Sequence, residues 1–162
     1  MVLDPKLLHE LFEYRPDGKL VRRLTLSGNA KAGEVAGTID GKGYLRVSIK
    51  KRVCLVHRII WTMVHGSCPP MLDHINGDKL DNRIENLRPC TNEQNQQNAG
   101  RLQSNTTGVK GVDWQHARKR YRARIHVERK RVTLGYFDTL EEAATAIKEA
   151  RSAYHGEFAK HE

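Results

Sequence analysis

An aspartate and a histidine stand side by side at Asp73 and His74, and three asparagines follow downstream, Asn82, Asn86 and Asn95. A carboxylate and a carboxamide oxygen can together hold a hard divalent cation, because such cations prefer oxygen ligands. The imidazole next to the carboxylate can accept a proton from water near neutral pH. These residue types at this spacing predict the hydrolysis of a phosphodiester bond.

Each residue of this group also has a purely structural interpretation. An Asp-His pair is most often part of a surface turn, and the downstream asparagines are what favours a site over a turn. His57 begins an expected helix and can simply pack there, which we favour, whereas Arg58 can grip a phosphate or pair with an acid. We expect the remaining histidines to be structural or exposed: His9, His65, His116, His155 and His161.

The chain carries a strong excess of positive charge. Its 162 residues include 28 Lys and Arg against 19 Asp and Glu, a formal net charge of +9. This excess favours a polyanionic partner, either a nucleic acid or an acidic membrane surface. No apolar run approaches the roughly 20 residues of a membrane span, and the N-terminal stretch lacks the apolar core of a signal peptide. We therefore expect a cytoplasmic protein without a membrane partner, in the host cytoplasm if a phage encodes it.

Three cysteines, Cys54, Cys68 and Cys90, are spaced too widely to form a CxxC pair. Structural zinc sites of the ribbon type are built from such pairs. We therefore expect three free thiols in a reducing compartment and a catalytic site that does not depend on zinc.

Residues 1–66 are predicted to form a small β-rich unit that ends in a helix. Tyr44–Ile49 alternates polar and apolar residues as a half-buried strand does. Lys50–Lys51 suits the tip of a hairpin, after which the chain returns. His57–His65 has the pattern of a short helix, and Gly66 is a usual C-terminal stop.

The stretch at residues 71–98 is expected to fold as strand, loop, strand and helix. Its polar run at residues 76–82 is typical of a loop, and Ile84–Leu87 can return as a strand.

Thr91 and Gln94 form a capping box, so a helix is expected from Asn92, with Asn95 on it. The short polar stretch at residues 100–107 predicts a linker or hinge.

A second unit follows, in which alternation predicts strands. The first strand has apolar residues on one face, Tyr121, Ala123, Ile125 and Val127, and basic residues on the other, Arg122, Arg124 and His126. A second strand repeats the alternation at Val132, Leu134 and Tyr136, and a third is expected near Val109–Trp114. A capping box at Thr139 and Glu142 opens a helix with an alanine-rich stripe that suits packing on a sheet.

Positive charge is concentrated in this second unit. Between Lys110 and Arg131 there are nine Lys and Arg and two acids, so nine minus two leaves a local excess of +7. A solvated face that only aids solubility is one interpretation. Charge on the face opposite the helix, interleaved with Trp114 and Tyr121, better fits a sheet laid into a groove of DNA.

Residues 40–98 resemble the HNH endonucleases found in phages and mobile introns. The resemblance is carried by VHRIIW, DHINGDKLDNRIENLR and TNEQNQQN, in which the elements DH, DNR, NLR and QN follow the order and spacing of that family.

The resemblance implies a ββα-metal site. In it Asp73 would ligate the metal, His74 would be the general base, and Asn95 would be the second metal ligand. Asn86 would match the central asparagine that orients the loop and the histidine, and Asn82 would support the loop, although either of these two can hold the central role. Two protein ligands suit Mg²⁺, or another divalent cation such as Mn²⁺, because Mg²⁺ keeps several waters.

Residues 105–159 resemble the plant ethylene-response-factor DNA-binding domain, through TTGVKGVDW, RYRARIHV, RVTLGYF and DTLEEAATAIKEARSAYHGEFA. The resemblance implies DNA contacts by Lys110, Trp114, Arg124, His126, Arg131 and Thr133, and the charged strand face adds Arg122. Lys110, Arg124 and Thr133 depart from the residues usual in that family, so its base preference is not transferred.

These features predict an α+β protein in two parts. Residues 1–99 would form an HNH nuclease domain, an N-terminal β-rich unit with the ββα-metal motif at about residues 71–98. After the linker at residues 100–107, residues 108–162 would form a DNA-binding domain, a small three-stranded antiparallel sheet packed on one helix.

The function expected is that of a metal-dependent endonuclease for double-stranded DNA, a site-preferring nickase or homing-type enzyme. The alternative is a catalytically inactive DNA-binding transcriptional regulator. An RNA-directed protein is a third class, disfavoured because aromatic stacking residues are few. One active site per chain predicts nicking by a monomer, and we expect a monomer or a weak dimer.

Overall fold

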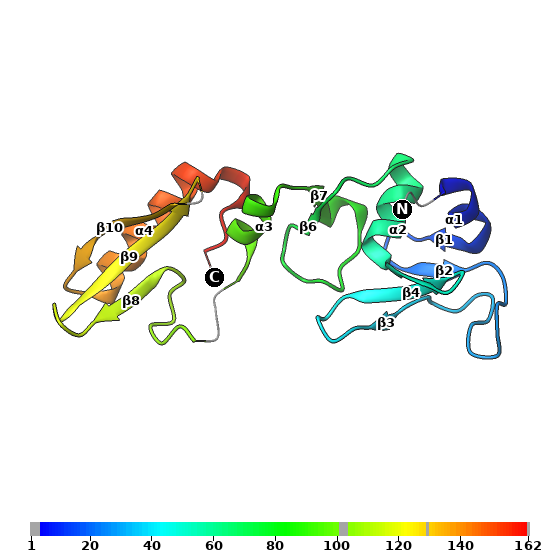
Figure 1. The fold of residues 1–162 in the computed structure, drawn as a ribbon, viewed down its shortest axis with the longest axis horizontal. Helices are drawn as coiled ribbons and strands as arrows, with labels where there is room; N and C mark the ends of the chain where they lie inside the picture. The colour runs from blue at the N-terminus through cyan, green and yellow to red at the C-terminus, as the bar shows by residue number, and fades with distance from the viewer. Residues whose placement is uncertain (1–3, 101–103, 129, 162) are drawn as a thin grey trace. The chain divides into compact units, whose positions relative to one another are not determined.

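The computed structural model describes residues 4–100, 104–128 and 130–161, and the chain divides into two compact units, Met1–Pro89 and Cys90–Glu162 (Figure 1). Each unit has a hydrophobic core of its own. The described residues form four α-helices and four small antiparallel sheets, which confirms the expectation of a fold that mixes helices with small antiparallel sheets. No helix in these ranges is long and apolar enough to cross a bilayer.

The first unit is built from short elements. In chain order they are α1 (Pro5–Leu11), β1 (Phe12–Tyr14), β2 (Leu20–Arg22), β3 (Thr38–Ile39), β4 (Leu45–Ile49), β5 (Arg52–Leu55), α2 (Val56–His65), β6 (Leu72–His74), the 3₁₀ turn η1 (Ile84–Asn86) and β7 (Leu87–Pro89). Strand β1 pairs with β2, β4 lies between β3 and β5, and β6 pairs with β7, all antiparallel. The expected hairpin and the helix that follows it are confirmed.

Helix α2 provides the centre of the first core. Its buried residues Val56, Ile59, Ile60 and Met63 recur at the spacing of one helical face. They pack with Leu8 of α1 and with apolar residues of the sheets, and burying each such side chain contributes about 1.5–3 kcal/mol. The helix ends at Gly66, whose φ of +77° is readily adopted by glycine.

The return strand after the predicted loop starts later than expected. Ile84–Asn86 forms the 3₁₀ turn η1, and β7 begins at Leu87. The backbone N–H of Ile84 donates to the hydroxyl of Tyr14 at 3.0 Å. Because this N–H is then not used in strand pairing, the 3₁₀ turn is favoured over a strand. The strand predicted over Ile84–Leu87 is therefore wrong in all but its last residue.

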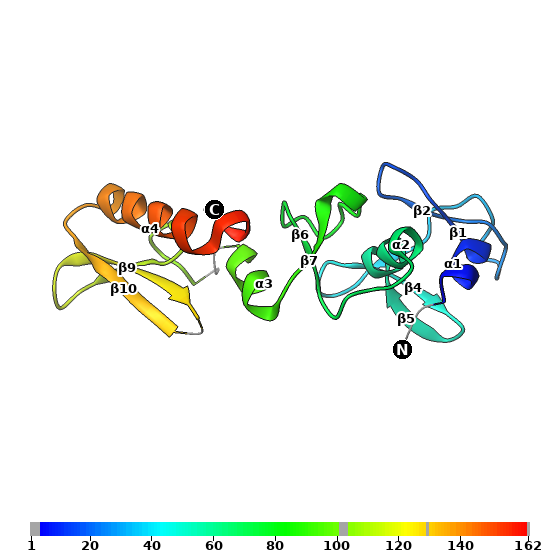
Figure 2. The ribbon, with the colours of Figure 1, turned by 90° about the horizontal axis from the view of Figure 1, so that it is seen from above.

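The second unit consists of α3 (Asn92–Asn98), β8 (Val112–Gln115), β9 (Arg120–Val127), β10 (Lys130–Phe137), α4 (Leu140–His155) and the 3₁₀ turn η2 (Gly156–Phe158). Strand β9 lies between β8 and β10 in one antiparallel sheet, and α4 runs along one face of that sheet (Figure 2). Both predicted capping boxes, at Thr91 and at Thr139, are present. The three-stranded sheet on one helix is confirmed.

A β-bulge changes which residues of β10 face the core. The register shifts between Thr133 and Gly135, so that Tyr136 pairs with Arg122 on the charged face and Phe137 joins the core instead. The expected facing therefore holds for Val132, which is paired with buried Ile125, and for Leu134, which packs against the core, but it is wrong for Tyr136. The extra residue of a bulge reverses the facing of the side chains beyond it.

Trp114 also lies on another face than expected. It pairs directly with Tyr121, and the ring centroids are 4.7 Å apart. Tyr121 shares its strand face with buried Ala123, which packs in the core under α4. The expectation that these two aromatic rings are interleaved with the charged side chains is wrong.

Helix α3 packs within the second unit. The ammonium group of Lys110 donates to the backbone oxygens of Gln97, at 2.7 Å, and of Ala99, at the C-terminal end of α3. The compact units thus divide between Pro89 and Cys90, whereas the functional bounds at residues 1–99, 100–107 and 108–162 remain a prediction. Residues 101–103 of the expected linker lie outside the described ranges.

Gly18 approaches the backbone that leads into η1. Its φ is +84°, and a Cβ at this position would lie 2.8 Å from the backbone nitrogen of Arg83. Gly33 has nearly the same φ, +81°, but no described atom within 4 Å of its Cβ position. We expect Gly33→Ala to destabilise the protein by about 1 kcal/mol through backbone strain alone, and Gly18→Ala by about 1–3 kcal/mol more through overpacking.

Urea denaturation of the two variants measures this difference. Equal losses of the free energy of unfolding in Gly18→Ala and Gly33→Ala would show that the close approach to Arg83 contributes nothing.

Candidate active site

Asp73 and His74 lie on β6, all three residues of which are buried. The register places Asp73 directly opposite Arg88 of β7. Both the Nε and the Nη2 of Arg88 donate to the Oδ2 of Asp73, at 3.2 and 3.1 Å. The side chains are only 7% and 11% exposed, so Arg88 supplies the countercharge that a buried carboxylate requires. No role was expected of Arg88 from the sequence. Pairing the strand that contains Asp73-His74 with the strand that contains Asn86-Leu87-Arg88 could have placed Arg88 beside Asp73.

His74 is held by Asn82. The Nε2 of His74 lies 3.2 Å from the Oδ1 of Asn82, and the Nδ2 of Asn82 donates to the backbone oxygen of Leu80 at 3.1 Å. Because Asn82 uses its nitrogen as a donor to Leu80, its oxygen is the acceptor towards His74. The proton of a neutral His74 is then on Nε2, and its lone pair is on Nδ1.

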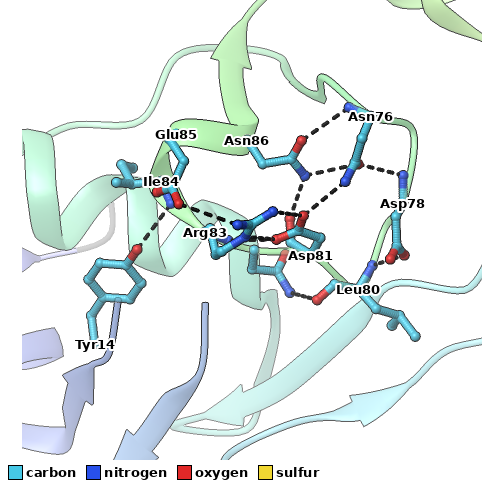
Figure 3. A network of polar contacts seen from close by, with 10 residues as sticks. Tyr14, Asn76, Asp78, Leu80, Asp81, Arg83, Ile84, Glu85 and Asn86 are labelled. Carbon is cyan, nitrogen blue, oxygen red and sulfur yellow. Dashed lines mark hydrogen bonds and ion pairs between the residues drawn. The ribbon is translucent and has the colours of Figure 1, made fainter. Parts of the chain in front are cut away.

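Asn86 is bonded to the loop at residues 76–82 (Figure 3). Its Oδ1 accepts from the backbone N–H of Asn76 at 3.1 Å, and its Nδ2 donates to the Oδ1 of Asn76 and to the backbone oxygen of Asp81. Asn86 thus holds the two ends of the loop together, whereas Asn82 contacts His74. Which of the two asparagines holds the central role stays a prediction.

The same loop is anchored by an ion pair. Arg83 donates to both carboxylate oxygens of Asp81 at 2.8 Å, and these hydrogen bonds lower the pKa of Asp81 to about 2. At the other side, Lys79 donates to the backbone oxygen of Lys42 and lies 4.7 Å from the ring centroid of Tyr44. Lys79 therefore joins the loop that carries Asn82 to the turn before β4.

His57 and Tyr44 pack against His74. The centroids of the two imidazoles are 5.0 Å apart, with the rings nearly perpendicular, and Tyr44 lies 5.5 Å from His57 and 6.0 Å from His74. His57 is 5% exposed, and its Nδ1 has no hydrogen-bond partner among the described residues. Burial, aided by the nearby His74 and Arg58, lowers the pKa of His57 to about 3, so this ring is neutral near pH 7.

Neither of these neighbours was placed beside His74 by the sequence interpretation, because contacts between distant segments leave no trace in local spacing. Arg58 forms no ion pair with an acid among the described residues, and its contact with a phosphate stays a prediction. Its guanidinium donates to the backbone oxygens of Pro69 and Pro70, at 3.0 and 3.2 Å, and so holds the chain that enters β6.

Asn95 lies half-buried on α3, which is part of the second unit. Its role as a metal ligand, and the ββα-metal arrangement that this role requires, stay predictions. The described residues contain no group of three or more His, Cys, Asp or Glu side chains that could hold a metal ion. One carboxylate and one carboxamide are hard oxygen donors, and so few protein ligands fit a divalent cation that keeps most of its water.

The charged face of the second sheet gathers most of the residues predicted to contact DNA. Arg122 and Arg124 share one face of β9 with His126, and β10 places Thr133 opposite Arg124 and Arg131 opposite His126. On the same face both arginines of β9 are paired with Asp113, at 2.9 and 2.8 Å.

Two of the predicted DNA contacts lie elsewhere. Trp114 is on the face that carries α4, and Lys110 is bonded to the end of α3. Burial lowers the pKa of Lys110 to about 8. As DNA contacts all seven residues stay predictions, and Arg129, one of the nine cations counted above, lies outside the described ranges.

Comparison with known proteins yields two matches. The HNH endonuclease family model matches residues 54–97, a range that contains every residue predicted for the nuclease site. "Protein 3.8" of Escherichia phage T7 is 33% identical over 106 residues, which make up 64% of this chain and 87% of that protein. No solved structure matches the chain.

The buried His57 gives the stability of the protein a pH dependence. Its pKa is about 3 in the folded chain and 6.5 ordinarily, so between these values the unfolded chain binds a proton that the folded chain does not. Stability therefore falls as the pH falls from about 6.5, with a slope that approaches about 1.4 kcal/mol per pH unit.

Denaturant titrations at pH 7, 6 and 5 compare the wild type with His57→Phe, which keeps a ring and removes the titration. We expect the variant to lose less stability over this range. A variant that loses as much as the wild type would contradict the assignment.

Proposed function

This chain belongs to the same family as protein 3.8 of phage T7 and contains an HNH endonuclease domain at residues 54–97, and on that premise we propose that it is a metal-dependent endonuclease that cuts double-stranded DNA. The observation that supports this most directly is the hydrogen bond between His74 of β6 and Asn82 of the loop that follows, next to the buried Asp73. It prepares one imidazole nitrogen as a base beside an oxygen ligand for a cation.

His74 is the general base of the proposed reaction. With the proton on Nε2 directed to Asn82, the Nδ1 lone pair takes the proton of the attacking water. A positioned general base contributes about 10²- to 10⁴-fold to the rate. Asn82 contributes by fixing the ring and its tautomer, as partners of a catalytic histidine commonly do.

Asp73 and Asn95 are the residues that would hold the cation, which we propose to be Mg²⁺ or Mn²⁺. When bound, a divalent cation stabilises negative charge on the phosphate and on the departing oxygen. Arg88 holds the Asp73 carboxylate in place through two charge-assisted hydrogen bonds.

Tyr44 and His57 enclose the base on the protein side. His57 is neutral near pH 7, so it adds no second positive charge beside the imidazole when His74 has taken a proton. Their rings also exclude water from one side of His74, which strengthens the electrostatic interactions there.

The second unit would hold the DNA. Its sheet has three antiparallel strands, with a helix on one face and cations on the other. We propose that this charged face enters a groove of the duplex. One candidate active site in each chain favours a site-preferring nickase or homing-type enzyme that acts as a monomer or weak dimer.

Plasmid cleavage tests the nuclease activity. Supercoiled plasmid with Mg²⁺ should be converted to the nicked form by the wild type, and EDTA should abolish the conversion. Because His74 accepts the proton, His74→Ala should lower the rate by about 10²- to 10⁴-fold. His65→Ala, on the exposed side of α2, is the matched control and should cleave like the wild type.

If the plasmid stays intact with Mg²⁺, Mn²⁺ and other divalent cations while the protein binds the duplex tightly, the endonuclease proposal fails. The alternative, a catalytically inactive DNA-binding regulator, would then be favoured.

The charged sheet face is tested by its salt dependence. Arg124→Gln removes a cation from the face away from α4, so the slope of log affinity against log salt concentration should fall by about 0.9. Lys148→Gln removes the same charge from the exposed side of α4 and should leave the slope unchanged. Equal slopes for Arg124→Gln and the wild type in a fluorescence-anisotropy titration would exclude this face as the binding surface.

A further inference from the structure

The tip of the β4–β5 hairpin has a backbone conformation that its residues disfavour. Ile49 pairs with Arg52, so the turn consists of Lys50 and Lys51 alone. Their φ angles are +48° and +65°. Positive φ at both turn residues is the type I′ arrangement, for which Asn-Gly is the preferred pair. Side chains with a Cβ are strained in this region, so local folding favours other residues at both positions.

The same tip concentrates positive charge. The segment from Arg46 to Arg52 contains four cations and no acid, and both turn lysines are exposed. Within the described ranges neither Lys50 nor Lys51 forms an ion pair with a carboxylate. Repulsion between neighbouring ammonium groups adds to the backbone strain. Two local rules of stability are therefore broken at one place, which indicates a role outside folding.

The hairpin connects this tip to the candidate active site. Tyr44, whose ring packs near His74, directly precedes β4. From Tyr44 to Lys50 the extended chain covers six residues, about 20 Å at roughly 3.3 Å per residue. The same length corresponds to roughly six base-pair steps of B-DNA. A duplex whose backbone lies at His74 can thus still pass the hairpin tip.

We propose that the β4–β5 hairpin is a phosphate-binding finger, in which Lys50 and Lys51 contact the DNA backbone roughly six base pairs from the bond that is cut. The inference rests on the proposed function, since it takes duplex DNA as the substrate. Lysine ammonium groups bind phosphates as point charges, and such contacts position the duplex without reading its sequence. The finger sets the direction of the DNA across the first unit, independently of the sheet in the second unit.

The type I′ turn offers a variant that separates binding from folding. Lys50→Asn with Lys51→Gly installs the preferred turn pair and removes two positive charges. Because it relieves strain, this double variant should unfold at a temperature several degrees above that of the wild type. A lower unfolding temperature of the double variant would show that Lys50 and Lys51 do not destabilise the turn, and would contradict the proposal.

DNA affinity is then measured for the full chain with a labelled 40-base-pair duplex in EDTA, over a series of salt concentrations. The double variant should bind roughly 10- to 60-fold more weakly at 0.1 M salt, and its salt slope should fall by about 1.8, or 0.9 for each lost phosphate contact. Lys50→Arg with Lys51→Arg keeps both charges and should bind like the wild type.

The matched control removes two exposed lysines elsewhere on the first unit, Lys6→Gln with Lys31→Gln, and should retain the wild-type slope. If the salt slope falls equally in this control, the weaker binding of the hairpin variant is explained by net charge alone, and the proposed phosphate-binding role of the hairpin is wrong. A wild-type slope in the hairpin variant would overturn the finger and leave the proposed nuclease intact. A wild type that binds no duplex would overturn both.

Discussion

The buried ion pair between Asp73 and Arg88 is the interaction on which the geometry of the candidate site depends. Strand pairing sets the two residues directly opposite each other, and both are almost inaccessible to water. Removing one partner of such a pair typically destabilises a protein by about 3–5 kcal/mol, because the other charge is left buried and uncompensated. The register of β6 and β7 is therefore coupled to the charge of the candidate metal ligand. That same register sets His74 opposite Leu87 and brings the loop between the strands back over the imidazole.

Local signals in the sequence were sufficient for elements whose stability is local. The two capping boxes, the α2 helix with its Gly66 stop and the hairpin tip at Lys50–Lys51 each depend on residues a few positions apart, and each is present. The failures came where a contact with another segment, or the register of strand pairing, decides the structure. Tyr14 draws Ile84 into a turn, and a single bulged residue in β10 moves Tyr136 to the charged face.

The candidate site shows the same division. Asp73, His74 and Asn82 could be named from residue type and spacing, and the structure places Asn82 against His74. No role at the site was assigned to Arg88 or Tyr44, and His57 was expected only to pack, because these residues reach the site through strand pairing and through segments distant in the sequence. Residue spacing can identify a candidate general base and a candidate metal ligand beside it. It cannot identify the countercharge and the rings that tune their surroundings, since these belong to the tertiary structure.

The contacts of Lys110 with the end of α3 affect where recombination could exchange the C-terminal unit without disrupting the fold. The stretch that resembles a nuclease ends in a helix that folds with the C-terminal residues, so the motif is continuous in sequence but is not a single folding unit. A recombination event in the polar stretch at residues 100–107 would separate this helix from the lysine that binds its last carbonyls. A junction between Pro89 and Cys90 would keep them together. Exchange of C-terminal units among relatives is therefore less disruptive when the helix travels with the unit that holds it.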